Sequence, residues 1–191
     1  RFDLILIISG FNISKKNILS LKQHSKKAKV VVYQWDSFLN NPNGINLINY
    51  SDTYYSFDFE DCKMYNLKYK PLFFVDHKST QVASNIDVLF VGKLHGKRLK
   101  LLKKLFKKNR NTIIKILVSP LRYYYVLLTN IFSFRKMKSW LITAKVDYNN
   151  YLNLLSRSNV IVDIHHLKQS GLTMRSIEAL SAKKKLLTTN A

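Results

Sequence analysis

The sequence predicts an α/β protein made of two units, each with a parallel sheet. Short apolar runs with the length of buried strands alternate with helical patterns along the chain. This alternation is interrupted once, by the polar and non-periodic residues 75–85, and then resumes. Alternating strands and helices are typical of parallel sheets, because each parallel connection needs a crossover. We therefore expect one unit at residues 1–75 and a second at 76–191, with a linker at the start of the second.

The first unit is expected to alternate four strands with three short helices. The expected strands are Leu4–Ile8, Lys29–Tyr33, Thr53–Ser56 and Lys70–Phe74. The expected helices are Lys15–Ser25 with Ser14 as its cap, Ile45–Tyr50 after the turn cluster Asn40–Gly44, and a helix from Asp58 to about Asn66. Leu4–Ile8 has the length of a buried strand, and Ile18, Leu19 and Leu21 would form the apolar side of the first helix.

The second unit repeats the pattern. Its expected strands are Asp87–Val91, which ends in Gly92, then Thr112–Val118, Val160–Ile164 and Lys185–Thr188. Its expected helices are Lys97–Lys108, a helix from the cap Asp147 to about Arg157, and Thr173–Ala182.

The segment from Pro120 to Ile142 has a different character, since it mixes many aromatic and aliphatic residues with four basic ones. Two interpretations stay open. A basic, aromatic, amphipathic helix can lie in a membrane interface, and an ordinary helix half-buried in the core has the same pattern. It is not a spanning helix, because Arg122, Arg135 and Lys136 bound its apolar stretch too closely.

Composition limits the class of protein without identifying it. The 191 residues are 47% hydrophobic and 13% aromatic, which is ample for a packed core. The net charge of +21 has three explanations: coding bias in a chain rich in Lys, Asn and Ile, attraction to an anionic membrane, or binding of nucleic acid. The lone Cys62 excludes an internal disulfide and fits a reducing compartment. The chain begins at Arg1 without Met and stops at Ala191 after a strand, so we expect a fragment truncated at both ends.

The stretch from Val160 to Asn190 reads as strand, polar loop, helix and strand. A strand that leads through such a loop to a helix N-terminus is a common way to present N–H groups to phosphate. Gly171, Leu172 and Thr173 end the loop, although Thr173 would also serve as a simple helix cap. Arg175 lies in the first helical turn, where a cation opposes the helix dipole, so we expect a phosphate contact or a solvated side chain.

Six pieces of the sequence form a recognisable set of motifs: Tyr33–Ser37, Tyr55–Asp58, Phe90–Lys93 with Arg98, Asp163–His166, Gln169–Glu178 and Lys184–Asn190. Together they resemble a family of bacterial glycosyltransferases that act in lipopolysaccharide or capsule assembly. The resemblance covers nearly the whole chain, and the motif around Gln169–Glu178 is the most specific. It implies the GT-B fold, in which two Rossmann-like lobes bind a sugar nucleotide, mostly through the C-terminal lobe.

The resemblance also assigns roles to residues of the donor lobe. Gly92 would let a pyrophosphate approach the backbone, although it would equally serve as a turn glycine. Lys93 and Arg98 would neutralise the phosphates. Glu178 would hold the ribose hydroxyls, its alternative being an ion pair with Arg175.

Three further expectations concern the chemistry of the site. Gln169 completes the donor residues, together with His165 and His166, one of which would face the donor while its neighbour points the opposite way. Asp36 is the candidate catalytic base because it follows a strand of the first unit, although a turn cap explains it as well. No Asp-x-Asp motif occurs, so we expect no metal and no cofactor.

The resemblance therefore implies transfer of a sugar from a nucleotide-sugar donor to a glycan or glycolipid acceptor, by a cytoplasmic enzyme at the inner face of the membrane. The expected partners are that donor, that acceptor and anionic lipid, with no nucleic acid. Two alternatives remain: a non-catalytic subunit that keeps the fold, and a basic nucleic-acid-binding protein.

Overall fold

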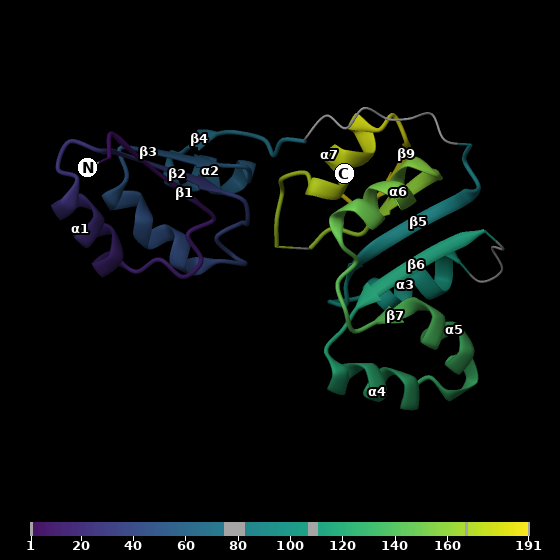
Figure 1. The fold of residues 1–191 in the computed structure, drawn as a ribbon. Coiled ribbons are helices and arrows are strands. Elements are labelled where there is room, and N and C mark those ends of the chain that lie inside the picture. The colour runs from purple at the N-terminus through teal and green to yellow at the C-terminus, as the bar shows by residue number, and fades with distance from the viewer. Residues whose placement is uncertain (1, 75–82, 107–110, 167, 191) are drawn as a thin grey trace. The chain divides into compact units, whose positions relative to one another are not determined.

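A computed structural model describes the chain except for residues 1, 75–82, 107–110, 167 and 191. The described residues form two parallel sheets in two compact units (Figure 1). Arg1–Phe73 and Leu167–Met174 make up the first unit, and Phe74–His166 and Arg175–Ala191 the second. The predicted α/β class with two separate parallel sheets is confirmed. Most of the predicted linker lies outside the described residues.

The first unit has a four-stranded sheet in the order of the sequence. Its strands are β1 (Leu4–Ile8), β2 (Lys29–Gln34), β3 (Thr53–Ser56) and β4 (Lys68–Tyr69), and each neighbouring pair is parallel. The connections are α1 (Lys15–His24), the 3-10 helix η1 (Pro42–Tyr50) and α2 (Phe59–Tyr65). Ile7, Ile18, Val30, Val32 and Leu47 lie in the core that these elements enclose.

The predicted helix caps of this unit are confirmed. Ser14 begins α1 with a capping box, in which its hydroxyl accepts from the Asn17 N–H while the Asn17 side chain accepts from the Ser14 N–H. Asp58 begins α2 and accepts from the N–H groups of Glu60 and Asp61. Caps follow from local hydrogen-bonding needs, which explains why the sequence alone indicated them.

Three expectations for the first unit are wrong. The fourth strand ends at Tyr69 and does not run from Lys70 to Phe74, and Pro71 has no N–H to extend the pairing. In α1 only Ile18 is buried, while Leu19 and Leu21 are about 40% exposed. Along β1 the side chains alternate, with Ile7 buried and Leu4, Leu6 and Ile8 exposed, so one face of this strand is uncovered in the described structure and the strand is not buried on both faces.

The second unit has a five-stranded parallel sheet in the order β7-β6-β5-β8-β9. Its strands are β5 (Ile86–Lys93), β6 (Thr112–Leu117), β7 (Leu141–Ile142), β8 (Ser158–Asp163) and β9 (Lys185–Thr188). From β5 the chain builds outward through β6 to β7 and then returns to place β8 on the other side of β5. The strand order therefore reverses between β5 and β8, which is where open parallel sheets bind ligands.

Helices cover both faces of this sheet (Figure 1). On one face α3 (Arg98–Leu105) and α5 (Phe134–Trp140) pack with Phe90 of β5 and Val162 of β8. On the other face α6 (Tyr148–Ser156) and α7 (Met174–Ser181) pack with Leu89 and Ile161, the neighbouring residues on the same strands. The alternation of side chains along β5 and β8 thus fills two cores.

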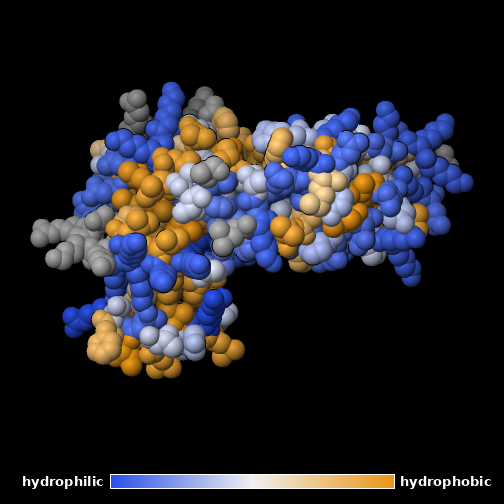
Figure 2. Space-filling model, turned by 180° about the vertical axis from the view of Figure 1, so that it is seen from behind, coloured by the Kyte–Doolittle hydropathy of each residue, from blue (hydrophilic) through white to orange (hydrophobic). Residues whose placement is uncertain are grey.

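The aromatic segment forms two helices instead of one. It comprises α4 (Pro120–Leu128), the 3-10 turn η2 (Ile131–Ser133) and α5. Helix α5 packs on β6, and α4 packs on α5. Hydrophobic side chains reach the surface in several places, as Figure 2 shows. Across the part of the chain that is described, no helix is long and apolar enough to cross a bilayer.

Candidate donor-binding site

The candidate site lies at the carboxyl ends of β5 and β8, at the strand-order reversal of the second unit. Gly92 and Lys93 end β5, and Asp163 ends β8. Arg98 begins α3, and Arg175 lies in the first turn of α7. Of the residues predicted from the sequence, this point of the sheet therefore unites Gly92, Lys93, Arg98 and Arg175.

Two guanidinium groups surround Gly92. A Cβ atom there would lie 3.1 Å from Arg98 Nη1 and 3.5 Å from Arg175 Nη2. Both guanidinium groups also lie over the Phe90 ring, 5.4 and 5.6 Å from its centroid. Glycine leaves room for the two cations to converge on the strand end, a role that is distinct from turn formation.

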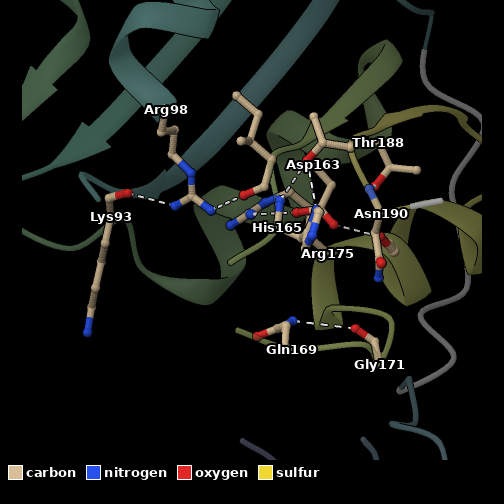
Figure 3. A network of polar contacts seen from close by, with 12 residues as sticks. Lys93, Arg98, Asp163, His165, Gln169, Gly171, Arg175, Thr188 and Asn190 are labelled. Carbon is tan, nitrogen blue, oxygen red and sulfur yellow. Dashed lines mark hydrogen bonds and ion pairs between the residues drawn. The ribbon is translucent and has the colours of Figure 1, made fainter. Parts of the chain in front are cut away.

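Arg98 is held by two backbone carbonyls, which are neutral acceptors and do not balance its positive charge. It is 6% exposed, and its guanidinium donates to the carbonyls of Lys93, at 2.6 Å, and of Ile164 (Figure 3). Burial and the nearby Arg175 lower the pKa of Arg98 to about 10. The two positive charges repel each other in a site with little solvent. A bound anion would reduce this repulsion.

Asp163 partly compensates this charge. It is fully buried, lies 3.5 Å from Arg175 Nη1 and accepts a 2.7 Å hydrogen bond from the Ser176 hydroxyl. The Nε atoms of Arg98 and Arg175 are buried and have no hydrogen-bond partner within the described structure. Buried cationic N–H groups without partners are uncommon, and an anionic acceptor would satisfy them.

The neighbouring histidines point to different partners, as expected for an extended chain. The Nδ1 atom of His165 lies 2.8 Å from the Thr189 hydroxyl oxygen. The His166 ring instead packs against His95, with 4.9 Å between ring centroids. Burial, the Arg98 guanidinium, the His166 ring and the guanidinium groups of Arg175 and Arg122 lower the pKa of His95 to about 4, so His95 is neutral at pH 7.

The side chains of Lys93 and Glu178 have surroundings of their own. The Lys93 side chain is exposed and extends away from Arg98, to which Lys93 offers only its carbonyl (Figure 3). Glu178 lies against two tyrosines of α6. Burial raises the pKa of Tyr148 and Tyr151, and the Glu178 carboxylate raises both further. This acid therefore sits in a cluster with phenolic hydroxyls.

The predicted phosphate loop makes its contacts within the first unit. Asp58, 2% exposed, accepts from the Ser170 N–H at 2.6 Å, from the Ser170 hydroxyl at 2.8 Å and from the Gly171 N–H at 3.4 Å. A Cβ atom on Gly171 would come within 2.5 Å of the Phe57 carbonyl oxygen. The glycine is required for this close packing, and its N–H faces a carboxylate in this structure.

The remaining predicted residues belong to the same unit. Gln169 donates a long 3.4 Å hydrogen bond to the Gly171 carbonyl. Leu172 is 41% exposed, and Thr173 precedes the first residue of α7. Asp36 is exposed and lies two residues after the end of β2.

The sequence interpretation missed four residues that the structure makes prominent. Both guanidinium groups lie over the Phe90 ring, His95 packs on His166, and Asp163 pairs with Arg175. Asp58 was recognised only as a helix cap, although it also binds Ser170, 112 residues away. Phe90 and Asp163 lie in the motifs Phe90–Lys93 and Asp163–His166, and His95 lies between Gly92 and Arg98, so each of these three had a local signal. The described residues contain no group of three or more His, Cys, Asp or Glu side chains that would hold a metal ion.

Comparisons with solved structures identify the architecture as GT-B-like. An α-glucosyltransferase in complex with UDP and a mismatched 13-mer DNA superposes with a TM-score of 0.63 at 16% identity, over 97% of this chain and 59% of that one. The Glycosylation Associate Protein (Gap123) complex from Streptococcus agalactiae matches with a TM-score of 0.52 at 13% identity, over 97% of this chain and 42% of that one. The chain thus spans less than two thirds of either neighbour. No protein-family model and no curated protein match the sequence.

Proposed function

We propose that the chain is part of a glycosyltransferase that moves a sugar from a nucleotide-sugar donor to a glycan acceptor. One observation carries the proposal: Arg98 and Arg175 converge on Gly92 at the strand-order reversal, each with a buried Nε atom that lacks a partner in the described structure. A diphosphate would supply the missing acceptor oxygens and negative charge. The GT-B-like architecture supports this assignment, because one structural neighbour is an α-glucosyltransferase in complex with UDP.

The other residues would have positioning roles around the diphosphate. Asp163 would position the Arg175 guanidinium. One of its carboxylate oxygens pairs with Arg175, and the other is held by the Ser176 hydroxyl, which fixes the orientation of the carboxylate. Glu178 would accept the ribose hydroxyls, and Tyr148 beside it would limit how that carboxylate rotates. We propose that the donor binds without a metal ion, with Arg98 and Arg175 supplying positive charge to the diphosphate.

A hollow of about 550 Å³ in the first unit is the best candidate for the acceptor. It lies between the loop after β1 and η1, and its lining includes four asparagines and the rings of Phe11 and Tyr50. The asparagine residues are Asn12, Asn43, Asn46 and Asn49. Side-chain amides and exposed aromatic rings suit the hydroxyls and apolar faces of sugars. We extend the proposal to a lipid-linked acceptor of surface-polysaccharide synthesis, which would place the enzyme at the inner face of the membrane.

Titration calorimetry with UDP-glucose tests the donor site. Arg175→Gln should weaken binding by about tenfold or more, because one charged phosphate contact is lost while an amide remains to bond Asp163. The matched control is Arg157→Ala, which removes an arginine that bonds Asn85 at the opposite, amino-terminal end of β5. It should leave the affinity unchanged.

Equal affinity in the wild type and in Arg175→Gln would contradict the donor site, provided that both proteins unfold at the same temperature. Other nucleotide sugars belong in the same screen, since the arginines address the diphosphate and not the base. Release of free sugar from the donor in a turnover assay separates an enzyme from a non-catalytic GT-B-like subunit, which would bind the donor without turnover.

A further inference from the structure

A stripe of fully solvent-facing apolar side chains runs along α4 and into η2. Leu121, Tyr124, Tyr125 and Leu128 recur at helical spacing and are 66–87% exposed. Ile131 and Phe132 continue the stripe, and Phe132 has no cover at all. These six residues, the α4–η2 stripe, lie at the lower end of the second unit, where Figure 2 shows hydrophobic side chains on the surface.

This exposure is not needed for packing. Helix α4 buries Val126 and Leu127 on its inner side and contacts α5, so its attachment to the unit is already complete. Its outer side is therefore a second apolar face. Contiguous exposed patches of this kind usually mark a surface that is covered in the working state of a protein.

The charge around the stripe indicates the chemistry of a partner that would cover it. Between Asp87 and Asp147 the sequence contains no Asp or Glu and fifteen Lys or Arg residues. Arg122, Arg135 and Lys138 flank the stripe and are exposed. A hollow of about 380 Å³ beside the start of α4 is lined by Arg122 and Lys145, and an anionic headgroup would fit this chemistry. Apolar side chains surrounded by uncompensated cations match an anionic lipid surface.

We infer that the α4–η2 stripe is a membrane-docking surface for anionic phospholipid. Nucleic acid explains the cations but not the exposed Leu121, Leu128 and Ile131, which offer neither hydrogen bonds nor flat rings for stacking. A second copy of the chain would bring like charges together, since each carries +21. The inference uses no residue of the donor site and does not depend on the proposed reaction.

Sedimentation of the 191-residue chain with vesicles tests the inference. We expect binding to vesicles of phosphatidylcholine with phosphatidylglycerol, and little binding to phosphatidylcholine alone. A variant with Leu121→Gln, Leu128→Gln, Ile131→Ser and Phe132→Ser should lose at least about tenfold in partition coefficient, because several apolar side chains no longer enter the lipid. The matched control, Leu39→Gln with Met64→Gln, changes residues of the first unit that are 68% and 73% exposed, and it should bind as the wild type does.

Two further measurements separate insertion from simple attraction of charge. Arg135→Glu with Lys138→Glu should weaken binding in a salt-dependent manner. Phe132→Trp should add a fluorescence component that shifts to the blue on anionic vesicles and is quenched by brominated acyl chains. The inference is overturned by absent binding to anionic vesicles at low salt, by equal loss in the control variant, or by retention on polynucleotide that depends on the stripe while vesicles do not bind.

Discussion

At the scale of single residues, the candidate site has more positive than negative side chains, and this excess of positive charge would favour an anionic ligand. Arg98, Arg175 and His95 crowd around the end of β5, and Asp163 is the carboxylate that pairs with Arg175. The structure limits this repulsion by keeping His95 neutral, since its pKa falls to about 4. A bound diphosphate would reverse the balance, because an anion near an imidazole favours its protonated form.

This reversal predicts that donor binding is linked to proton uptake by His95. Between the pKa of about 4 in the free chain and the higher value in the complex, UDP-glucose affinity should increase as the pH falls. We expect a gain of about two- to threefold between about pH 7.5 and pH 5.5, absent in His95→Asn. Calorimetry in buffers of different ionisation enthalpy measures the proton uptake directly.

The sign for folding is opposite to that for binding. An unfolded histidine has a pKa of 6.5, so the unfolded chain binds more protons and stability falls as the pH drops from about 6.5 toward 4. Affinities must therefore be measured where the chain is still folded. His24→Asn is the matched control, because His24 lies on α1 of the first unit. Identical pH profiles for the wild type and His95→Asn would contradict the linkage.

At the scale of single elements, the sequence predicted what local chemistry determines. Ser14, Asp58 and Asp147 were each recognised as helix caps, and Thr53–Ser56 and Lys185–Thr188 are strands at the predicted bounds. It failed where tertiary contacts decide. The periodicity of α4 did not reveal which of its apolar faces is buried, and no local pattern shows that β1 is an edge strand of the described sheet.

The segment 168–174 is the element for which the sequence was least informative. Its Gly-Leu-Thr pattern indicated phosphate binding, whereas its Ser170 and Gly171 N–H groups donate to Asp58. Contacts between residues 112 apart have no local signature. The loop therefore presents N–H groups to an anion, as predicted, but in this structure the anion is the carboxylate of Asp58.

Asp58→Ala should therefore destabilise the first unit by more than loss of a cap. Removal of the α2 cap and of the bonds to Ser170 and Gly171 should cost on the order of 3 kcal/mol of unfolding free energy. The matched variant is Asp147→Ala, which removes the cap of α6 alone and should cost about 1 kcal/mol. Urea unfolding measures both changes, and hydrogen exchange of the Ser170 amide should quicken in Asp58→Ala only. Equal losses, or unchanged Ser170 exchange, would refute this assignment.

At the scale of the whole chain, alternation of strands and helices sufficed to predict two parallel sheets, because that rule depends on the order of elements and not on their exact bounds. The same rule does not predict the order of strands within the second sheet. The return of β8 to the far side of β5 creates the ligand-binding end of the sheet, and it results from packing across both faces.

The net charge of +21 is the whole-molecule property that still needs a test, because one structural neighbour is a glucosyltransferase bound to DNA. If the charge only attracts polyanions, duplex DNA should bind at low salt without sequence preference. Its affinity should then fall by about a thousandfold or more between about 50 mM and 200 mM salt, because counterion release drives such binding. Filter binding at several salt concentrations measures this slope.

Donor binding should behave differently, since it depends on a few buried contacts that salt screens weakly. UDP-glucose should not displace DNA, and Arg175→Gln should leave DNA affinity unchanged while it weakens the donor. DNA affinity that persists at high salt, distinguishes sequences or competes with UDP-glucose would instead indicate a dedicated nucleic-acid site that includes Arg98 and Arg175. The positive charge would then contribute to specific recognition of nucleic acid, and nucleic acids would become the candidate acceptors.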